Sequence, residues 1–397
     1  MVGNVAEVGV ALIGTAFMGR AHSHAWRSAS HFFDLPLRPK MKLLVGADPI
    51  RTMSAAETLG WQSWSSDWRE AVNREDIDLI DICTPGYLHE EIAIAALEAG
   101  KHVICEKPLA NDVHAAERMA NAAKVAAPRA LAVCGFSYRR TPALALARRM
   151  IQEGALGKVR HVRAQYLQDW LSDRKTPWSW RLDKSLAGSG ALGDIAAHSI
   201  DTVQWLLNDQ IEDVSSRLVT FVSERAVSDG RVDLGGEANE SGKTKGVTVD
   251  DAAAFTANLK SGALGVFEAT RFATGRRNAN RVELNGEFGS IAFDFERLNE
   301  LEYFDARQSR SSQGFSRIQA TDATHPYTAN WWPVGHGIGY GDLFVNQAAD
   351  ILRDLAANRQ PQPDFESALD VQRVLEAVSE SASANSMITT VKREVVL

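Results

Sequence analysis

Residues 8–19 read VGVALIGTAFMG and decide the fold of the first part of the chain. The run 8–13 is mostly apolar, as in a buried parallel strand, and it leads directly into a loop with glycine at both ends. This loop is a dinucleotide fingerprint with alanine in place of its middle glycine. The backbone N–H groups of such a loop and a helix N-terminus bind a pyrophosphate. We therefore expect five loop residues to bind a dinucleotide: Gly14, Thr15, Ala16, Phe17 and Met18.

Apolar runs and helical stretches continue to alternate as far as residue 136. The further strand candidates are 42–48, 77–85, 102–108 and 130–136, and a helical pattern occupies 87–101. Apolar strands separated by helices indicate a parallel sheet that is covered on both faces. We predict an α/β domain over residues 1–137, a doubly wound NAD(P)-binding Rossmann domain.

An acidic residue closes the second strand candidate. Asp48 can bind the adenine-side ribose hydroxyls, although its interval from Gly14 exceeds the usual spacing of about 20 residues. Residues 31–41 look like an insertion that accounts for the excess. An acid disfavours a 2′-phosphate, so we expect NAD, while Arg51 keeps NADP possible. A structural α/β turn with a surface aspartate is the alternative.

The pattern changes after Phe136. Helices are expected over 141–153 and 192–207, and two more are expected to close the chain. Strands without intervening helices indicate a mostly antiparallel sheet. The two closing helices are expected over 340–357 and 365–383, and the polar segment 225–250 is expected to be a surface loop. The expected strands are near 158–167 and at 214–223, 251–259, 263–271, 280–285 and 289–295. We predict an α+β substrate-binding and oligomerisation domain over 138–397, built on a large open sheet.

Composition bounds the class of protein. The chain has 397 residues, 45% hydrophobic and 23% charged, which suits a globular protein with two cores. A net charge of −7 argues against nucleic-acid binding. There is no signal-peptide pattern or membrane-spanning apolar run. Three cysteines without close pairs fit a reducing compartment, so we expect a cytoplasmic protein.

Two neighbouring strand candidates end in polar residues, Thr84-Pro85 and Glu106-Lys107-Pro108. Ligands of open parallel sheets bind beyond the carboxyl ends of the strands. The ammonium group of Lys107 could hold a substrate oxygen there and stabilise a developing alkoxide. The alternative is an exposed turn with an incidental ion pair, because exposed ion pairs are common and contribute little to stability.

The segment GDIAAHSID (193–201) carries a second candidate constellation. In a helix, Asp194, His198 and Asp201 would share one face, where the histidine could act as a general base. A surface helix with an Asp–His pair and a metal site are the alternatives. We expect no metal, because no second His/Cys cluster accompanies the segment. His22 and His24 are expected to be surface or cofactor-proximal residues.

Three stretches resemble the Gfo/Idh/MocA family: LIGTAFMGRAH (12–22), the long segment 82–110 that ends in EKPLA, and SGALGDIAAHSID (189–201). The resemblance implies an NAD(P)-dependent dehydrogenase that acts on the CH–OH group of a sugar, anhydrosugar or polyol of levoglucosan or inositol type. It implies that Lys107 positions the hydroxyl, His198 is the acid/base and Asp194 assists. It also places further residues at cofactor positions: Thr84, His89, Glu106, Trp180 and Arg181.

A sugar offers C–H faces for stacking and hydroxyl edges for hydrogen bonds. We expect four residues to bind the substrate: Tyr138, Arg163, Gln168 and His336. Trp170, Trp331 and Trp332 could stack on the sugar, although core or interface packing explains each equally well. The family resemblance implies a homodimer or homotetramer that forms through the C-terminal sheet. An NAD-dependent glycosidase and a non-catalytic cofactor-binding regulator are the alternative functions.

Overall fold

The computed structural model describes residues 5–228 and 240–393. The chain divides into two compact units. Met1–Arg140 and Tyr327–Leu369 form the first unit, and Thr141–Pro326 and Asp370–Leu397 form the second. The second unit thus begins three residues after the expected boundary, and a late segment returns to the first unit. The predicted division into functional domains, 1–137 for the cofactor and 138–397 for substrate and oligomerisation, stays a prediction.

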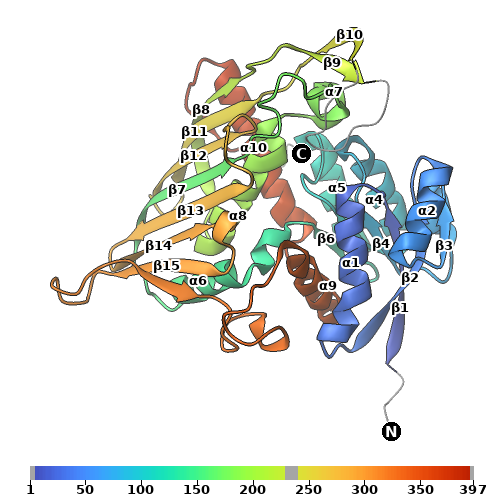
Figure 1. Cartoon of the computed structure of the whole chain (residues 1–397), viewed down its shortest axis with the longest axis horizontal. Coiled ribbons are helices and arrows are strands. Elements are labelled where there is room, and N and C mark those ends of the chain that lie inside the picture. The colour runs from blue at the N-terminus through green and yellow to red at the C-terminus, as the bar shows by residue number, and fades with distance from the viewer. Residues whose placement is uncertain (1–4, 229–239, 394–397) are drawn as a thin grey trace. The chain divides into compact units, whose positions relative to one another are not determined.

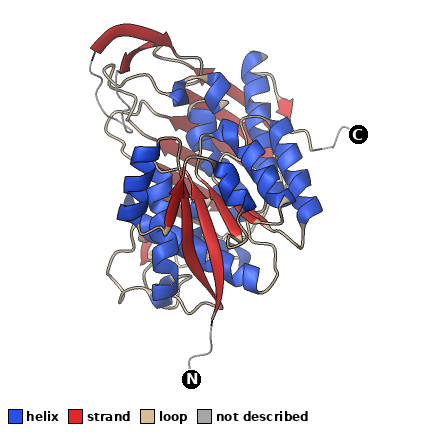
Figure 2. Cartoon of the chain, turned by 90° about the vertical axis from the view of Figure 1, so that its right-hand side faces the viewer, coloured by secondary structure: helices blue, strands red, loops and turns tan. Residues whose placement is uncertain are grey.

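The first unit contains a six-stranded sheet in which all the pairs are parallel, as predicted for a Rossmann domain (Figure 2). The strand order is β3-β2-β1-β4-β5-β6. The strands are β1 (Ala6–Ile13), β2 (Leu37–Val45), β3 (Ser63–Ser65), β4 (Leu79–Ile82), β5 (His102–Cys105) and β6 (Ala132–Cys134). The expected insertion at 31–41 was wrong, because β2 begins at Leu37 and pairs with β1 from there.

Helices flank this sheet, and most begin or end where the sequence provides a cap. The helices are α1 (Phe17–Phe32), α2 (Pro49–Leu59), α3 (Trp68–Asn73), α4 (His89–Glu98), α5 (Val113–Ala126) and α9 (Tyr340–Ala356), with short helices η1 (Gly86–Leu88), η2 (Ser137–Arg140) and η6 (Thr328–Asn330). Asp112, for example, accepts the backbone N–H of Ala115 at 2.8 Å at the start of α5. The late helix α9 packs along α1 (Figure 1), which explains why it belongs to this unit.

The second unit is built on a nine-stranded open sheet that is antiparallel except for the parallel β7–β12 pair. The order is β16-β15-β14-β13-β7-β12-β11-β8-β17. The strands are β7 (Val159–Leu167), β8 (Ile211–Val219), β11 (Ala252–Leu259), β12 (Leu264–Thr270), β13 (Ala279–Gly286), β14 (Gly289–Asp294), β15 (Glu300–Asp305), β16 (Ser316–Gln319) and β17 (Thr389–Thr390). The predicted mostly antiparallel sheet is confirmed.

Alternation along the strands gives this sheet one buried and one exposed face. In β12, Phe267 and Ala269 are buried, whereas Leu264 and Val266 are 44% and 40% exposed. Helices α6 and α8 pack against strands of the sheet. The helical elements are α6 (Pro142–Gln152), η3 (Trp180–Leu182), α7 (Lys184–Ala187), the π-helical turn η4 (Leu192–Ala196), α8 (Ala197–Leu207), η5 (Phe295–Arg297) and α10 (Phe365–Ser383), which continues from the first unit.

The expected surface loop at 225–250 was wrong in part. β9 (Glu224–Ser228) and β10 (Glu240–Gly246) pair as an antiparallel ribbon, while 229–239 lie outside the described residues. Polar, glycine-containing strands of this kind lack the apolar alternation from which strands are predicted. Among the described residues, no helix is long and apolar enough to span a membrane.

Candidate active site

The loop after β1, where we expect a pyrophosphate to bind, turns tightly at Gly14. Gly14 has φ +123°, and a Cβ at this position would lie 2.5 Å from the carbonyl oxygen of Cys83. Ala16 has φ −80°, which alanine adopts without strain, so the missing glycine does not disturb the loop. No side chain caps the N-terminus of α1, so its first N–H groups suit an anionic ligand.

Asp48 stands at the N-terminus of α2, three residues beyond the end of β2. The strand was expected to end at Asp48 itself, so that boundary was wrong. The Asp48 carboxylate accepts the backbone N–H of Arg51 at 3.1 Å and lies 3.5 Å from Nε of the same residue. Both side chains are largely exposed. Their contact with the cofactor ribose stays a prediction.

His89 holds together the loops that follow β4 and β5. Its Nε2 lies 3.0 Å from the carbonyl oxygen of Thr84, and its Nδ1 lies 3.1 Å from that of Pro108. Burial lowers the pKa of His89, which favours a neutral ring. We infer that any role of His89 in cofactor binding is indirect. The Thr84 hydroxyl is buried without a hydrogen-bond partner in the described part of the chain, which fits a cofactor contact.

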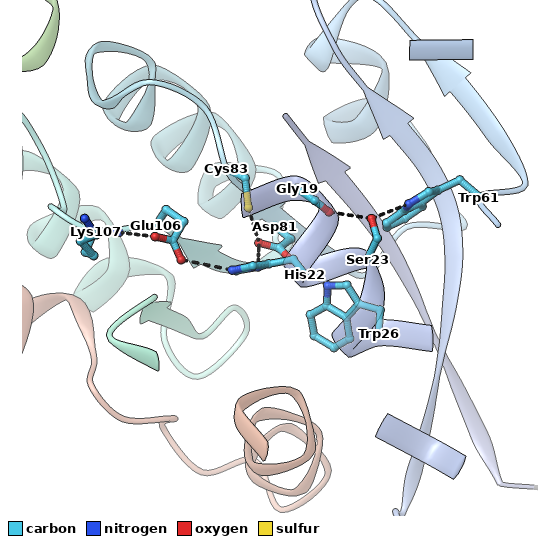
Figure 3. Close-up of polar contacts among 9 residues, drawn as sticks. All are labelled: Gly19, His22, Ser23, Trp26, Trp61, Asp81, Cys83, Glu106 and Lys107. Atoms are coloured by element: carbon cyan, nitrogen blue, oxygen red, sulfur yellow. Dashed lines mark hydrogen bonds and ion pairs between the residues drawn. The ribbon is translucent and has the colours of Figure 1, made fainter. Parts of the chain in front are cut away.

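Glu106 and Lys107 differ in their surroundings, although they are neighbours in sequence (Figure 3). Glu106 is 5% exposed, and its Oε1 lies 3.1 Å from Nε2 of His22. The backbone N–H of Lys107 donates to Oε2 of Glu106 at 3.3 Å. The pair is therefore not an exposed turn. Glu106 faces the interior and supports the residue that follows it.

His22 also contacts the end of β4. Its Nδ1 lies 2.9 Å from both carboxylate oxygens of Asp81, which accepts a further hydrogen bond from Trp26 Nε1 at 2.7 Å. Burial alone would lower the pKa of His22, but Asp81 outweighs it and the pKa lies well above its usual value. His22 was expected to be a surface or a cofactor-proximal residue; the surface alternative was wrong, because His22 is 2% exposed, and the other stays a prediction.

Cys83 completes a group with possible metal ligands. Ligand atoms of His22, Asp81 and Cys83 lie within 4.8 Å of one another. Burial raises the pKa of the Cys83 thiol, and its Sγ donates to Asp81 at 3.7 Å. A protonated thiol is a poor ligand, so the geometry supports a hydrogen-bonded network. The predicted absence of a metal stays a prediction.

In the second unit, the GDIAAHSID segment begins as the π-helical turn η4 and continues into α8. The Asp250 carboxylate accepts the backbone N–H groups of Gly190 at 2.7 Å and Leu192 at 2.8 Å. Burial raises the pKa of Asp250, although these donors oppose the change. A π-turn is common at functional sites. The segment is therefore docked at its first turn by a buried carboxylate.

The three polar residues of this segment lie in different surroundings. His198 and Asp201 are buried, so the surface-helix alternative was wrong, and the His198 ring lies 5.9 Å from that of Tyr166. Asp194 is partly exposed, and one oxygen lies 3.8 Å from the guanidinium of the fully buried Arg271. Arg271 thus holds Asp194 from the end of β12.

The end of β7 presents a cluster of amide groups on the same side of the sheet as His198. Asn278 Oδ1 accepts hydrogen bonds from Tyr166 at 2.7 Å and from Gln168 at 2.9 Å. Gln168 also accepts the indole N–H of Trp170 at 3.1 Å. The predicted role of Gln168 in substrate binding is compatible with this position.

Arg163 does not join that group. Because side chains alternate along β7, the exposed Arg163 points to the face opposite Tyr166. Its guanidinium lies 2.8 Å from Glu283 on the neighbouring strand. The role of Arg163 in substrate binding stays a prediction, and its place on the face opposite Tyr166 does not support it. A sequence without a known strand register does not show which face a residue occupies.

The remaining predicted residues are placed within their own units. In the second unit, the Arg181 guanidinium lies 4.6 Å from the centre of the Trp180 ring. In the first unit, Tyr138 is buried, His336 is exposed, and Trp331 packs on Phe32 with ring centres 4.6 Å apart. This contact supports core packing for Trp331. The cofactor roles of Trp180 and Arg181 and the substrate roles of Tyr138 and His336 stay predictions.

Sequence reasoning missed four residues that support the site. Asp81 gave a signal, because it is a charged residue inside the apolar run 77–85. Asp250 directly precedes the predicted strand 251–259 and Arg271 is the last residue of the predicted strand 263–271, and a polar residue is ordinary at both kinds of position. Asn278 gave no signal, because its role depends on the pairing of β7 with β13.

Comparison with known proteins assigns the chain to a family. Residues 8–133 match the model of an oxidoreductase family with an NAD-binding Rossmann fold, and residues 144–292 match that of the GFO/IDH/MocA C-terminal domain. The chain belongs to the Gfo/Idh/MocA family. It is an NAD-binding oxidoreductase, as the resemblance in the sequence predicted.

Several relatives of this family cover nearly the whole chain. Levoglucosan dehydrogenase from Pseudarthrobacter phenanthrenivorans is 41% identical over 385 residues, 96% of this chain and 98% of that protein. A solved oxidoreductase domain protein from Kribbella flavida is 53% identical, with a TM-score of 0.93 over 98% of this chain and 100% of that one. A solved levoglucosan dehydrogenase complex with NADH and levoglucosan is 39% identical, with a TM-score of 0.91 over the same shares.

Proposed function

We propose that this Gfo/Idh/MocA protein is an NAD-dependent dehydrogenase that oxidises a secondary hydroxyl of a sugar, anhydrosugar or polyol. Levoglucosan is the first candidate substrate. The observation that carries the proposal is the combination of Lys107 after β5 with a docked Asp194–His198 segment, in a chain 41% identical to levoglucosan dehydrogenase. A 26% identical relative, the myo-inositol 2-dehydrogenase of Thermotoga maritima, supports the wider class of polyols.

Bound NAD would supply the hydride acceptor. In the proposed mechanism the Lys107 ammonium group donates a hydrogen bond to the substrate hydroxyl oxygen and stabilises the alkoxide as it forms. His198 accepts the hydroxyl proton. We assign this step to Nε2, because Nδ1 of His198 is buried. General base catalysis of this kind contributes about 10²–10⁴-fold to a rate.

Asp194 and Arg271 would fix the start of the segment that carries His198. A buried guanidinium 3.8 Å from a partly exposed carboxylate restricts the orientation of that carboxylate. Gln168 and Asn278 offer amide groups that could bind sugar hydroxyls in the second unit. Tyr138 and His336 are the corresponding proposals in the first unit.

Asp48 supports the preference for NAD, because a carboxylate at the ribose would repel a 2′-phosphate. The exposed apolar side chains of β12, Leu264 and Val266, support a homodimer or homotetramer formed through the C-terminal sheet. A cytoplasmic location completes the proposal and rests on the small number of cysteines, three in 397 residues.

The test is NADH formation by the purified protein, followed by absorbance, across a panel of sugars, anhydrosugars and inositols with NAD or NADP. Turnover with levoglucosan as the preferred substrate supports the proposal. A glycosidase would release free sugar from aryl glycosides without net NADH. A regulator would bind NADH and turn over nothing, and either result would overturn the dehydrogenase proposal.

A further inference from the structure

The network around His22 spans three elements of the first unit (Figure 3). His22 is on α1, the helix whose N-terminus forms the proposed pyrophosphate site. Its two ring nitrogens contact Asp81 at the end of β4 and Glu106 directly after β5. One buried ring therefore bridges the cofactor helix and two adjacent strand ends.

The chemistry of these contacts favours a charged ring. An ionised carboxylate only accepts hydrogen bonds, and a neutral imidazole has one N–H to donate. Nδ1 is 2.9 Å from Asp81 and Nε2 is 3.1 Å from Glu106, so both nitrogens need a proton for both contacts to be hydrogen bonds. A buried charge of this kind persists only where it is paired, and here two carboxylates pair it.

The other groups that face the ring do not oppose this charge. Directly after β4, the Cys83 thiol donates to Asp81, and from α1 itself the indole of Trp26 does the same. From α9, Phe344 lies with its ring centre 5.3 Å from that of His22, and the uncharged Gln347 lines the small cavity beside it. The neighbours of His22 named here are all neutral or anionic.

A second branch of the network connects this helix to the segment between α2 and β3. Ser23 donates to the carbonyl oxygen of Gly19 at 2.7 Å and accepts the indole N–H of Trp61 at 2.9 Å. The first turns of α1 are therefore fixed on both sides, by Trp61 through Ser23 and by the carboxylates through His22.

We propose that His22 is a positioning residue, a buried imidazolium that ties the cofactor helix to the ends of β4 and β5. It thereby orients Glu106 and, through the Lys107 N–H to Glu106 hydrogen bond, the catalytic lysine. The inference rests on the proposed function only for the role of Lys107. Loss of the ring would leave two carboxylates buried near each other, and their repulsion would displace Glu106.

The test compares His22→Gln with His31→Gln, the same change at an exposed position of the same helix. We expect kcat to fall about 10–100-fold in His22→Gln, in line with a displacement near 1 Å, while KM for the sugar changes less than threefold. His31→Gln keeps wild-type values. If His22 and Asp81 act as one unit, the loss of kcat in the double variant Asp81→Asn/His22→Gln should differ from the combined losses of the two single variants.

Two readouts separate positioning from a merely structural role and do not require turnover. In protein labelled with ¹⁵N-histidine, both nitrogens of His22 should have imidazolium shifts at pH 7.5. The acylation rate of the Lys107 amine by trace acetic anhydride, measured by peptide mass spectrometry, should change more than threefold in His22→Gln and not in His31→Gln.

A neutral His22 at pH 7.5 would overturn the proposal. So would a folded, NADH-binding His22→Gln protein in which both kcat and Lys107 acylation stay within twofold of wild type. If the wild type oxidises no sugar, the proposed function fails. The NMR and acylation results then still decide the role of His22.

Discussion

Replacement of Gly190 by alanine tests how strictly the His198 segment is docked. A Cβ at this position would lie 1.7 Å from the carbonyl oxygen of Asp250 and 2.8 Å from Nη2 of Arg271. Real Cβ contacts are essentially never under 3.0 Å, so the backbone must move by about 1.3 Å, since the nearest neighbour is itself backbone. The hydrogen bonds of Gly190 and Leu192 to Asp250 would be stretched or lost.

We expect this overpacking to cost about 1–3 kcal/mol. For a unit of this size, each kcal/mol lowers Tm by about 2–4 °C. Because the displaced turn carries His198, a shift near 1 Å should lower kcat/KM by about 10²-fold. Gly314→Ala is the matched control, because its Cβ would meet nothing within 4 Å.

The assay is kcat/KM for sugar oxidation together with thermal unfolding of wild type and both variants. NADH affinity should stay within threefold, because the change lies outside the Rossmann domain. If Gly190→Ala retained wild-type Tm and kcat/KM, the docking of this segment by Asp250 would be refuted. Equal losses in Gly314→Ala would also contradict the argument.

Four further predictions follow from the same geometry. Lys107→Ala and His198→Ala should each lower kcat at least 10²-fold while NADH binding, measured by fluorescence, stays within threefold. Because the pKa of His22 is raised in the folded protein, its contribution to the free energy of unfolding is fully present below about pH 6.5. As the pH rises toward the folded pKa, the difference in free energy of unfolding between wild type and His22→Gln, measured by urea titration, should shrink by up to about 1.4 kcal/mol per pH unit. Arg163→Ala should keep kcat/KM within twofold, since a loss would place this residue in the substrate site after all. Val266→Asp should reduce the mass measured by light scattering to that of a monomer, and an unchanged mass would exclude this face as the interface.

The sequence was sufficient for those elements whose signal is local. The run 8–13 predicts a buried strand whatever surrounds it, and the loop that follows has glycines only where its backbone requires them. The predicted strands over 251–259 and 263–271 agree with β11 and β12, because their alternation repeats every two residues.

Failures occurred where tertiary contacts decide the outcome. The proline and charged residues of 37–41 obscured the first half of β2, which pairing with β1 nevertheless stabilises. Residue spacing alone did not place His22 between Asp81 and Glu106, which are 59 and 84 residues away. The face that Arg163 occupies was likewise not predictable, since the face of a strand residue depends on register.

The sequence predicted which types of residue form the proposed site, but it did not predict what surrounds them. Lys107 and His198 were identified from motifs. The residues that support them were found only in the structure, where Glu106 faces the interior and Asp250 binds the start of η4. These supports differ from the proposed catalytic residues, Lys107 and His198, because any acidic residue can serve as a cap or ion-pair partner. Motifs therefore indicate chemistry, and packing determines how precisely that chemistry is held.

The most direct test of the proposed chemistry is to follow deuterium from the sugar to the cofactor. The enzyme would be incubated with NAD and levoglucosan deuterated at every carbon-bound position, and the NADH formed would be analysed by mass spectrometry. Hydride transfer from carbon predicts NADH one mass unit heavier than the unlabelled cofactor. NADH without deuterium, or sugar conversion without net NADH, would contradict the assignment of this protein as a dehydrogenase.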